Sequence, residues 1–243
     1  MTIKHPAQGT TDTRSRESLL GLLQVSDSMF PSGAFAHSYG LEQLVRDGRV
    51  QNAVTLEAFV ASVIRQVGAT SDAVAARAAC ARAADGDVDG IVAVDRALMR
   101  TKAAEELRLA SIAVGRRLVE ETALHVESPV LREYATRLSA DRSLGTQPVA
   151  FGVVCTALAV DEADVAPALL QTAAAAILQA AMRLLPVSHR DVQAILNRLR
   201  PSIAAIVATL PDAHDSIVLQ SFHPMQEIAS MRHARAEARL FAS

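Results

Sequence analysis

The stretch VAPALLQTAAAAILQAAMRLL, residues 165–185, is the most apolar part of the later chain and indicates how the protein folds. Its few polar side chains fall within an arc of about 120° on a helix that turns 100° per residue: Gln171, Thr172, Gln179 and Arg183. Alanine contributes little transfer free energy, and Pro167 and Arg183 argue against a membrane span. We therefore expect residues 165–185 to form the central, buried helix of the fold.

The composition extends this expectation to the whole chain. Half of the 243 residues are hydrophobic, but only 3% are aromatic and there is no Trp, so the core must consist of Ala, Leu, Val and Ile. Alanine favours helix, and no segment shows the period-two alternation of a strand. We predict an all-α fold: a single compact, bundle-like domain of about ten helices with an Ala-rich core.

Three parts of the chain are expected to differ in how well ordered their structure is. The polar residues 1–16 should be a flexible N-terminal tail, and residues 17–243 should form the helical domain, whose first helix begins at Glu17. Within that domain, residues 225–243 are expected to form a mobile C-terminal helix and tail, with the helix running to Leu240.

Charge and cysteine content exclude several classes of protein. The net charge of -2 and the pI near 6.4 leave no basic surplus for nucleic acid or an anionic membrane. Cys80 and Cys155 lie far apart without CxxC spacing, which is typical of buried, inert thiols in a reducing compartment. The first sixteen residues lack the apolar core of a signal peptide. We expect a cytoplasmic protein that binds neither nucleic acid nor membrane.

The stretch QVSDSMFPSGAFAHSYGLE, residues 24–42, differs from the rest because it mixes turn residues, polar residues and aromatics. Its break predicts a new helix over 33–47 with Ser32 as the N-cap. Within that helix, Gly40 would cost about 1 kcal/mol against alanine, so it indicates that another backbone comes close. We interpret residues 24–42 as a contact surface for a partner protein, not a catalytic pocket.

Capping signals divide the remaining chain into helices. We expect one helix over 55–67 that Gly68 ends, and another over 130–138 after Ser128 and Pro129. Pro201 should separate a helix over 188–200 from one over 202–210, because proline removes a helical hydrogen bond.

The segment DGDVDG, residues 85–90, resembles a calcium loop. Its acidic residues and Gly90 match positions 1, 3, 5 and 6 of an EF-hand. Position 12 needs a bidentate Glu and here holds Arg96. We therefore expect a solvated acidic turn and no calcium site.

Other catalytic and metal-binding patterns are absent from the sequence. The seven histidines include no HxxxH or HxH pair, and there is no GxSxG elbow or phosphate-binding glycine loop. For His37, a hydrogen-bonding or interface role is favoured over metal coordination. Arg183 is expected in the last turn of the central helix, where the helix dipole favours a cation, so a structural and a functional role remain equally open. We expect no enzyme activity, no metal site and no cofactor.

LLQVSDSMFPSGAFAHSYGLE, residues 22–42, is similar to the opening signature of the UreF family of urease accessory proteins. Further similar motifs follow in the family's order: ELRLASIAVGRRL at 106–118, QPVAFG at 147–152, AAMRLLPVSH at 180–189 and RLFAS at 239–243. The chain departs from the family at Gln147, where His is frequent, and at Ser188 and His189, where Gly-Gln is frequent.

The resemblance implies an all-helical, commonly dimeric scaffold without catalytic activity. Such a protein binds UreD, also called UreH, and recruits the nickel-carrying GTPase UreG, so that nickel reaches apo-urease. Glu42 and Arg183 occupy the positions of a charged pair implicated in engaging the GTPase, which implies a UreG-facing surface. The resemblance also implies that the C-terminal tail becomes ordered when UreD binds. A helical scaffold for another metalloenzyme, or a helical enzyme without a recognisable motif, remains the alternative.

The expected partner-binding residues combine the two ends of the chain with the central helix. We expect Leu240 and Phe241 to dock on the segment 35–42, with the guanidinium of Arg239 stacked on the ring of Tyr39. The full set is Ser26, Asp27, Pro31, Gly33, His37, Ser38, Tyr39, Gly40, Glu42, Arg183, Arg239, Leu240 and Phe241.

Overall fold

A computed structural model describes residues 9–214 and 217–242, with side chains described from Ser15 onward. The helices are α1 (Gly9–Ser26), α2 (Leu41–Arg46), α3 (Ala53–Val63), α4 (Ala73–Ala84), α5 (Val88–Thr101), α6 (Glu105–Ala123), α7 (Pro129–Ala140), α8 (Gln147–Ala157), α9 (Glu162–Leu184), α10 (His189–Val207) and α11 (Pro224–His233). A 3₁₀ turn covers Ala34–Ala36 and a π-helical segment covers Ile64–Asp72. No strand occurs in the described ranges, so the predicted all-α class is confirmed.

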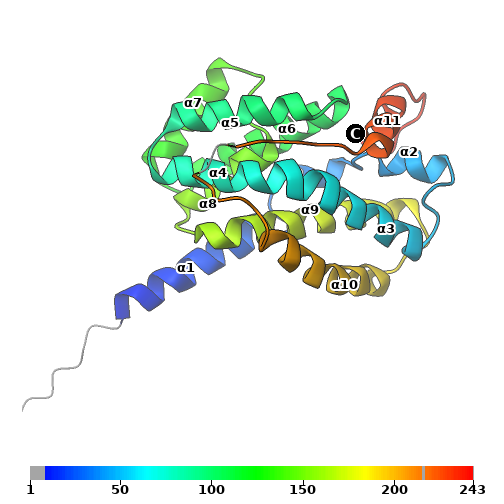
Figure 1. Cartoon of the computed structure of the whole chain (residues 1–243), viewed down its shortest axis with the longest axis horizontal. Coiled ribbons are helices and arrows are strands. Elements are labelled where there is room, and N and C mark those ends of the chain that lie inside the picture. The colour runs from blue at the N-terminus through cyan, green and yellow to red at the C-terminus, as the bar shows by residue number, and fades with distance from the viewer. Residues whose placement is uncertain (1–8, 215–216, 243) are drawn as a thin grey trace, which may run out of the picture.

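Helix α9 lies at the centre, as its sequence predicted. It packs against α4, α8 and α10, while α1 extends away from the helical body (Figure 1). Among the described helices, α9 alone is long and apolar enough to cross a membrane, and half of its most apolar window is buried inside the protein. That burial places α9 in the core of a folded domain.

Alanine and glycine allow the helices around α9 to approach closely. Five alanines of α4 have no exposed surface: Ala73, Ala75, Ala76, Ala78 and Ala79. A Cβ on Gly152 of α8 would collide with the carbonyl oxygen of Ala76, so glycine is needed where α8 crosses α4. Cys80 and Cys155 lie buried in the same cluster, and burial raises the pKa of both thiols.

The expected helix over 33–47 is wrong. The backbone turns left-handed at Gly33, Tyr39 and Gly40, with φ of 79°, 55° and 83°, so α2 begins only at Leu41. Ser32 is not an N-cap as expected. The residue at the N-cap of the 3₁₀ turn is Gly33, and no side chain caps that turn. The close backbone inferred at Gly40 is confirmed: a Cβ there would lie 3.1 Å from the carbonyl oxygen of Gln226.

Two expected helix ends are also wrong. Gly68 does not end a helix, since α3 continues through the π-helical segment into α4. A Cβ on Gly68 would lie 2.6 Å from Leu170 Cδ2, so this glycine serves packing against α9. Pro201 lies inside α10, and the buried stripe of that helix continues on both sides of it: Val192, Ile195, Leu199 and Ile203.

The terminal helices differ in length from the expectation. Helix α1 begins at Gly9, eight residues before Glu17, and α11 ends at His233, seven residues before Leu240. Residues 1–8 of the expected flexible tail, and Ser243 at the other end, lie outside the described residues. The mobility expected of residues 225–243 stays a prediction.

Candidate functional site

The segment 85–90 is the calcium-like motif of the sequence, and two of its three aspartates have other partners. Asp87 is the N-cap of α5, where its Oδ1 accepts a hydrogen bond of 2.8 Å from the backbone N–H of Gly90. Asp89 forms an ion pair of 2.9 Å with Arg137. No group of three or more His, Cys, Asp or Glu residues in the described part of the chain is placed to hold a metal ion.

Glu42 is the centre of the best-defined polar cluster. It lies in the first turn of α2 and is only 2% exposed, so its side chain is not a surface charge in this structure, and its role in engaging UreG stays a prediction. The C-terminal tail covers it. The backbone N–H groups of Leu240 and Phe241 donate to its carboxylate at 2.9 and 3.0 Å, and Arg46 donates from the next turn of α2.

The tail docks on the segment 36–42, as predicted. The backbone N–H of Ala242 donates to the carbonyl oxygen of Ala36 at 2.8 Å, which fixes the end of the tail beside the 3₁₀ turn. Phe241 is 4% exposed, whereas Leu240 remains half exposed. The sequence therefore predicted the docking site correctly but placed both apolar side chains in it, when only Phe241 is buried.

The expected stacking of Arg239 on Tyr39 is wrong. The guanidinium of Arg183 lies over the ring of Phe241 at 4.5 Å from its centroid, and Arg239 pairs with Glu106 at 3.5 Å. Arg183 and Glu42 therefore act on the same tail residue, one through the ring and the other through the backbone N–H.

Tyr39 lies beside α11 in a strained part of the backbone. Its φ of 55° aims its carbonyl oxygen at α11, where the side-chain amide of Gln226 donates to it at 3.1 Å. Burial, and then the charge of Asp72, raise the pKa of its phenol.

His233, the last residue of α11, joins Glu42 to α6. Its ring has no exposed surface and lies between two carboxylates: Nε2 is 2.9 Å from Glu42 and Nδ1 is 2.9 Å from Glu106. Ser230 donates to the second oxygen of Glu106 at 3.0 Å. Because the two carboxylates face opposite ring nitrogens, they cannot share one metal ion with this histidine.

The electrostatics of this cluster favour an ionised Glu42. Burial acts to raise the pKa of Glu42, but the tail amides of Leu240 and Phe241 together with His233 outweigh it, so the pKa lies below its ordinary value. His37 is 8% exposed, and burial lowers its pKa although the charge of Glu106 acts in the opposite direction. Ser38, also buried, precedes α2.

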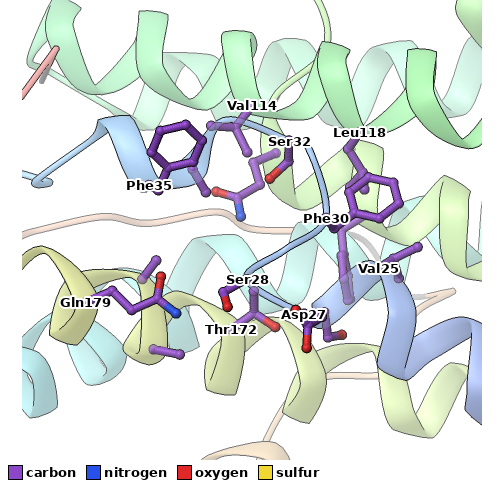
Figure 2. A pocket seen from close by; sticks show the side chains of 16 residues that line it. Val25, Asp27, Ser28, Phe30, Ser32, Phe35, Val114, Leu118, Thr172 and Gln179 are labelled. Atoms are coloured by element: carbon purple, nitrogen blue, oxygen red, sulfur yellow. The ribbon is translucent and has the colours of Figure 1, made fainter. Parts of the chain in front are cut away.

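Ser26 and Asp27 line a pocket of about 230 Å³ where α1 ends (Figure 2). Phe30, Phe35 and Phe151 supply apolar walls, and the polar lining residues are Ser26, Asp27, Ser28, Ser32, Gln147, Thr172 and Gln179. The Oγ of Ser26 is buried without a hydrogen-bond partner. Pro31 instead borders a second groove, which the exposed side chains of Leu20, Leu23 and Met29 line.

One face of α9 connects the pocket to the docked tail. Thr172, Ala176 and Gln179 line the pocket, and Arg183 follows one turn later at helical spacing. The 3₁₀ turn bridges the same two places, since Phe35 lines the pocket and Ala36 binds the tail. The structure therefore gathers most of the expected residues into two neighbouring groups, one at the pocket and one at the docked tail, whereas Pro31 borders the other groove and Tyr39 contacts α11.

Three important members of the tail cluster were missed: Glu106, Ser230 and His233. The sequence signal that could have revealed Glu106 and His233 was their position on a helix face. Glu106 shares a helix face with Ala110, and His233 shares one with Ala229, so each is an ionisable residue on a buried stripe.

Comparisons with known proteins agree with this arrangement. The family model for UreF matches residues 50–200. The chain is 34% identical over 228 residues to the urease accessory protein UreF 2 of Brucella canis, covering 94% of this chain and 93% of that protein. It is 32% identical over 225 residues to the urease accessory protein UreF of Yersinia pseudotuberculosis, covering 93% and 98%. Since these matches span nearly the whole chain, the protein belongs to the UreF family of urease accessory proteins.

Proposed function

We propose that this chain is a non-catalytic scaffold of urease maturation, which binds UreD (UreH) and recruits the nickel-carrying GTPase UreG so that nickel is inserted into apo-urease. Membership of the family supports a role in urease maturation. The observation that supports the partner-binding part is the composite surface that the tail, the segment 36–42 and Arg183 form together.

This surface has the character of a protein interface. Arg183 lies exposed beside the docked tail, Arg239 lies exposed within the tail, and Leu240 presents an apolar side chain to water. Phe35 and Leu109 add exposed apolar side chains on neighbouring segments, at 65% and 58% exposure. Apolar side chains with arginines are typical of residues that anchor protein complexes.

The remaining partner assignments follow from charge and exposed surface. The small net negative charge supports a protein that binds neither nucleic acid nor an anionic membrane. The two buried free cysteines, Cys80 and Cys155, are in keeping with a reducing compartment such as the cytoplasm. The apolar face of α1, with Leu19, Leu20 and Leu23 each more than half exposed, supports a homodimer.

A reconstitution of the complex tests this function. The purified chain is mixed with UreD and then with UreG, and size-exclusion chromatography shows which proteins elute together. We expect the chain to elute with UreD, and the pair to retain UreG. In cells that lack their own UreF, the chain should restore nickel-dependent urease activity.

Charge reversal separates the two partners. Arg183→Glu should reduce retention of UreG more than it weakens binding of UreD, and Arg190→Glu, at an exposed position at the start of α10, is the matched control. A wild-type chain that elutes apart from UreD would contradict the proposal. Equal retention of UreG by both variants would remove Arg183 from the GTPase-facing surface.

A further inference from the structure

The hydrogen-bond geometry around the ring of His233 determines how many protons this cluster must hold. Both of its nitrogens lie 2.9 Å from a carboxylate oxygen, of Glu42 on one side and Glu106 on the other, and the ring has no exposed surface. An ionised carboxylate only accepts hydrogen bonds, so each of the two N···O contacts needs a hydrogen. The docked arrangement therefore holds two protons among these three groups.

A neutral imidazole supplies only one of those protons. Its second nitrogen would then direct a lone pair at a carboxylate, in a place that water does not reach. The second proton can sit on the ring or on one of the carboxylates, and the count is the same in both cases.

The tail is connected directly to this contact. The same oxygen of Glu42 that faces His233 accepts the backbone N–H of Phe241 at 3.0 Å, and the tail leaves α11 immediately after His233. When the tail lifts away, Glu42 loses its two amide donors and water reaches the cluster. Water can donate to an unprotonated ring nitrogen, so the released state needs only one proton.

The other charges around the ring do not replace that proton. Arg46 from α2 donates to Glu42, and Arg239 from the tail lies 3.5 Å from Glu106. His37, on the segment before α2, interacts electrostatically with Glu106. On α11 itself, Arg232 pairs with Asp47 at 2.7 Å. None of these three arginines supplies a hydrogen between a ring nitrogen and its carboxylate.

We infer that docking of the C-terminal tail takes up one proton at the Glu42–His233–Glu106 cluster, which makes assembly of the partner-binding surface dependent on pH. That this surface receives partners rests on the proposed function. The proton-linked docking itself is a property of the isolated chain.

The direction of the dependence follows from linkage. The docked state holds one proton more than the released state, so the balance between the two states depends on pH. Docking should then weaken by up to about tenfold per pH unit as the pH rises. At the acidic end, the lowered pKa of Glu42 means that its contribution is present above the ordinary value of 4.5 and is lost as the pH falls below it.

Hydrogen exchange of the isolated full-length chain tests the inference. Exchange of the amides of Leu240 and Phe241 is measured from pH 6 to pH 9 and divided by the rate of an unstructured peptide of the same sequence. We expect protection in the tail to fall by up to about tenfold per pH unit as the pH rises across this range, while amides of α9 keep their protection. Constant protection of the tail across this range would overturn the inference.

Two variants remove the proton requirement while keeping a polar group in place. In Glu106→Gln the side-chain amide can donate to Nδ1 of a neutral His233, so the tail should stay docked and lose the pH slope. His233→Gln cannot take up a proton and should lose the slope as well. Glu105→Gln, which removes one charge from an exposed neighbouring position, should keep the wild-type slope.

The result of this test can be distinguished from a failure of the proposed partner binding. A wild-type slope that persists in both Glu106→Gln and His233→Gln would assign the effect to another group and overturn the inference. Because no partner is present, that result would leave binding of UreD and UreG untouched. Failure to bind these partners, with the slope intact, would overturn the proposed function alone.

Discussion

Glu42 receives hydrogen bonds from four residues in a place that water hardly reaches. Its donors come from three segments: Arg46 from its own helix, His233 from α11, and the amides of Leu240 and Phe241 from the tail. Removing its carboxylate would leave several buried donors without an acceptor. Each such group costs roughly 1 to 3 kcal/mol, so Glu42 contributes to stability as well as to the surface.

The first prediction compares Glu42 with Arg183. Glu42→Ala should lower the free energy of unfolding by about 2 to 3 kcal/mol, because buried donors lose their acceptor. Arg183→Ala should cost no more than about 1 kcal/mol, since an exposed cation over an aromatic ring contributes little. Urea denaturation followed by circular dichroism measures both. Equal, small losses would show that Glu42 is exposed in solution.

Asp95 of α5 plays a comparable role away from the partner-binding surface. It is fully buried and accepts hydrogen bonds from Tyr134, Gly145 and Thr146, which hold the turn that starts α8. That turn positions Gln147 in the wall of the pocket.

The second prediction follows from the number of donors around Asp95. Asp95→Asn should lower the free energy of unfolding by about 1 to 3 kcal/mol, because its NH₂ group would face hydrogen-bond donors. Tyr134→Phe removes one donor and leaves the carboxylate satisfied by the others, so it should cost about 1 kcal/mol. Thermal or urea unfolding of the two variants provides the comparison. An Asp95→Asn variant with the same free energy of unfolding as the wild type would contradict the view that several donors depend on this carboxylate.

At the scale of elements, local signals predicted helices well where they agreed with packing. Ser128 and Pro129 predicted the start of α7, and the structure shows Ser128 as the N-cap accepting from Leu131. The polar arc of residues 165–185 predicted that α9 is central.

The sequence was misleading where tertiary contacts override local preference. Gly33 and Gly40 can continue a helix or adopt positive φ, and the close approach of α11 at Gly40 selects the second. Pro201 removes one hydrogen bond, but burial on both sides of it stabilises a continuous α10. Neither outcome can be read from neighbours in sequence.

The same limit applies to the site. Docking of the tail was predictable from two large apolar residues near a terminus, because leaving them in water is unfavourable. The partner of each arginine was not predictable, since it depends on where α6, α9 and α11 meet.

The third prediction concerns the tail as an element. Deleting residues 239–243 should weaken the complex with UreD more than it lowers the melting temperature of the isolated chain. Deletion removes Phe241 from its buried site, so some loss of stability is expected too. Arg239→Ala is the milder variant, because its guanidinium is partly exposed and pairs only with Glu106 among the ion pairs of the described chain.

Size-exclusion chromatography with UreD and a thermal melt of each chain alone measure the two effects. A truncated chain that still elutes with UreD at wild-type strength would remove the tail from partner binding. A fall in melting temperature that accounts for the whole loss of complex would give the tail a structural role only.

For the molecule as a whole, the arrangement favours a scaffold that contacts several partners at once. The tail lies beside α2 and α11, whereas α1 extends away from the opposite side of the helical body (Figure 1). Helix α1 carries the exposed side chains of Leu19, Leu20 and Leu23. The face of α9 from Thr172 to Arg183 lies between the tail and α1. Partners at the two ends could therefore bind without overlapping.

The last prediction is that the chain forms a homodimer through α1. Leu19, Leu20 and Leu23 are 55%, 65% and 58% exposed, and a contiguous apolar face of this kind is a common site of association. Light scattering coupled to size-exclusion chromatography should give twice the mass of one chain for the wild type and one chain for Leu20→Glu. Val54→Glu adds the same charge at a 77% exposed position on α3 and should remain dimeric. A monomeric wild type at tens of micromolar would contradict the dimer, and a dimeric Leu20→Glu would move the interface away from α1.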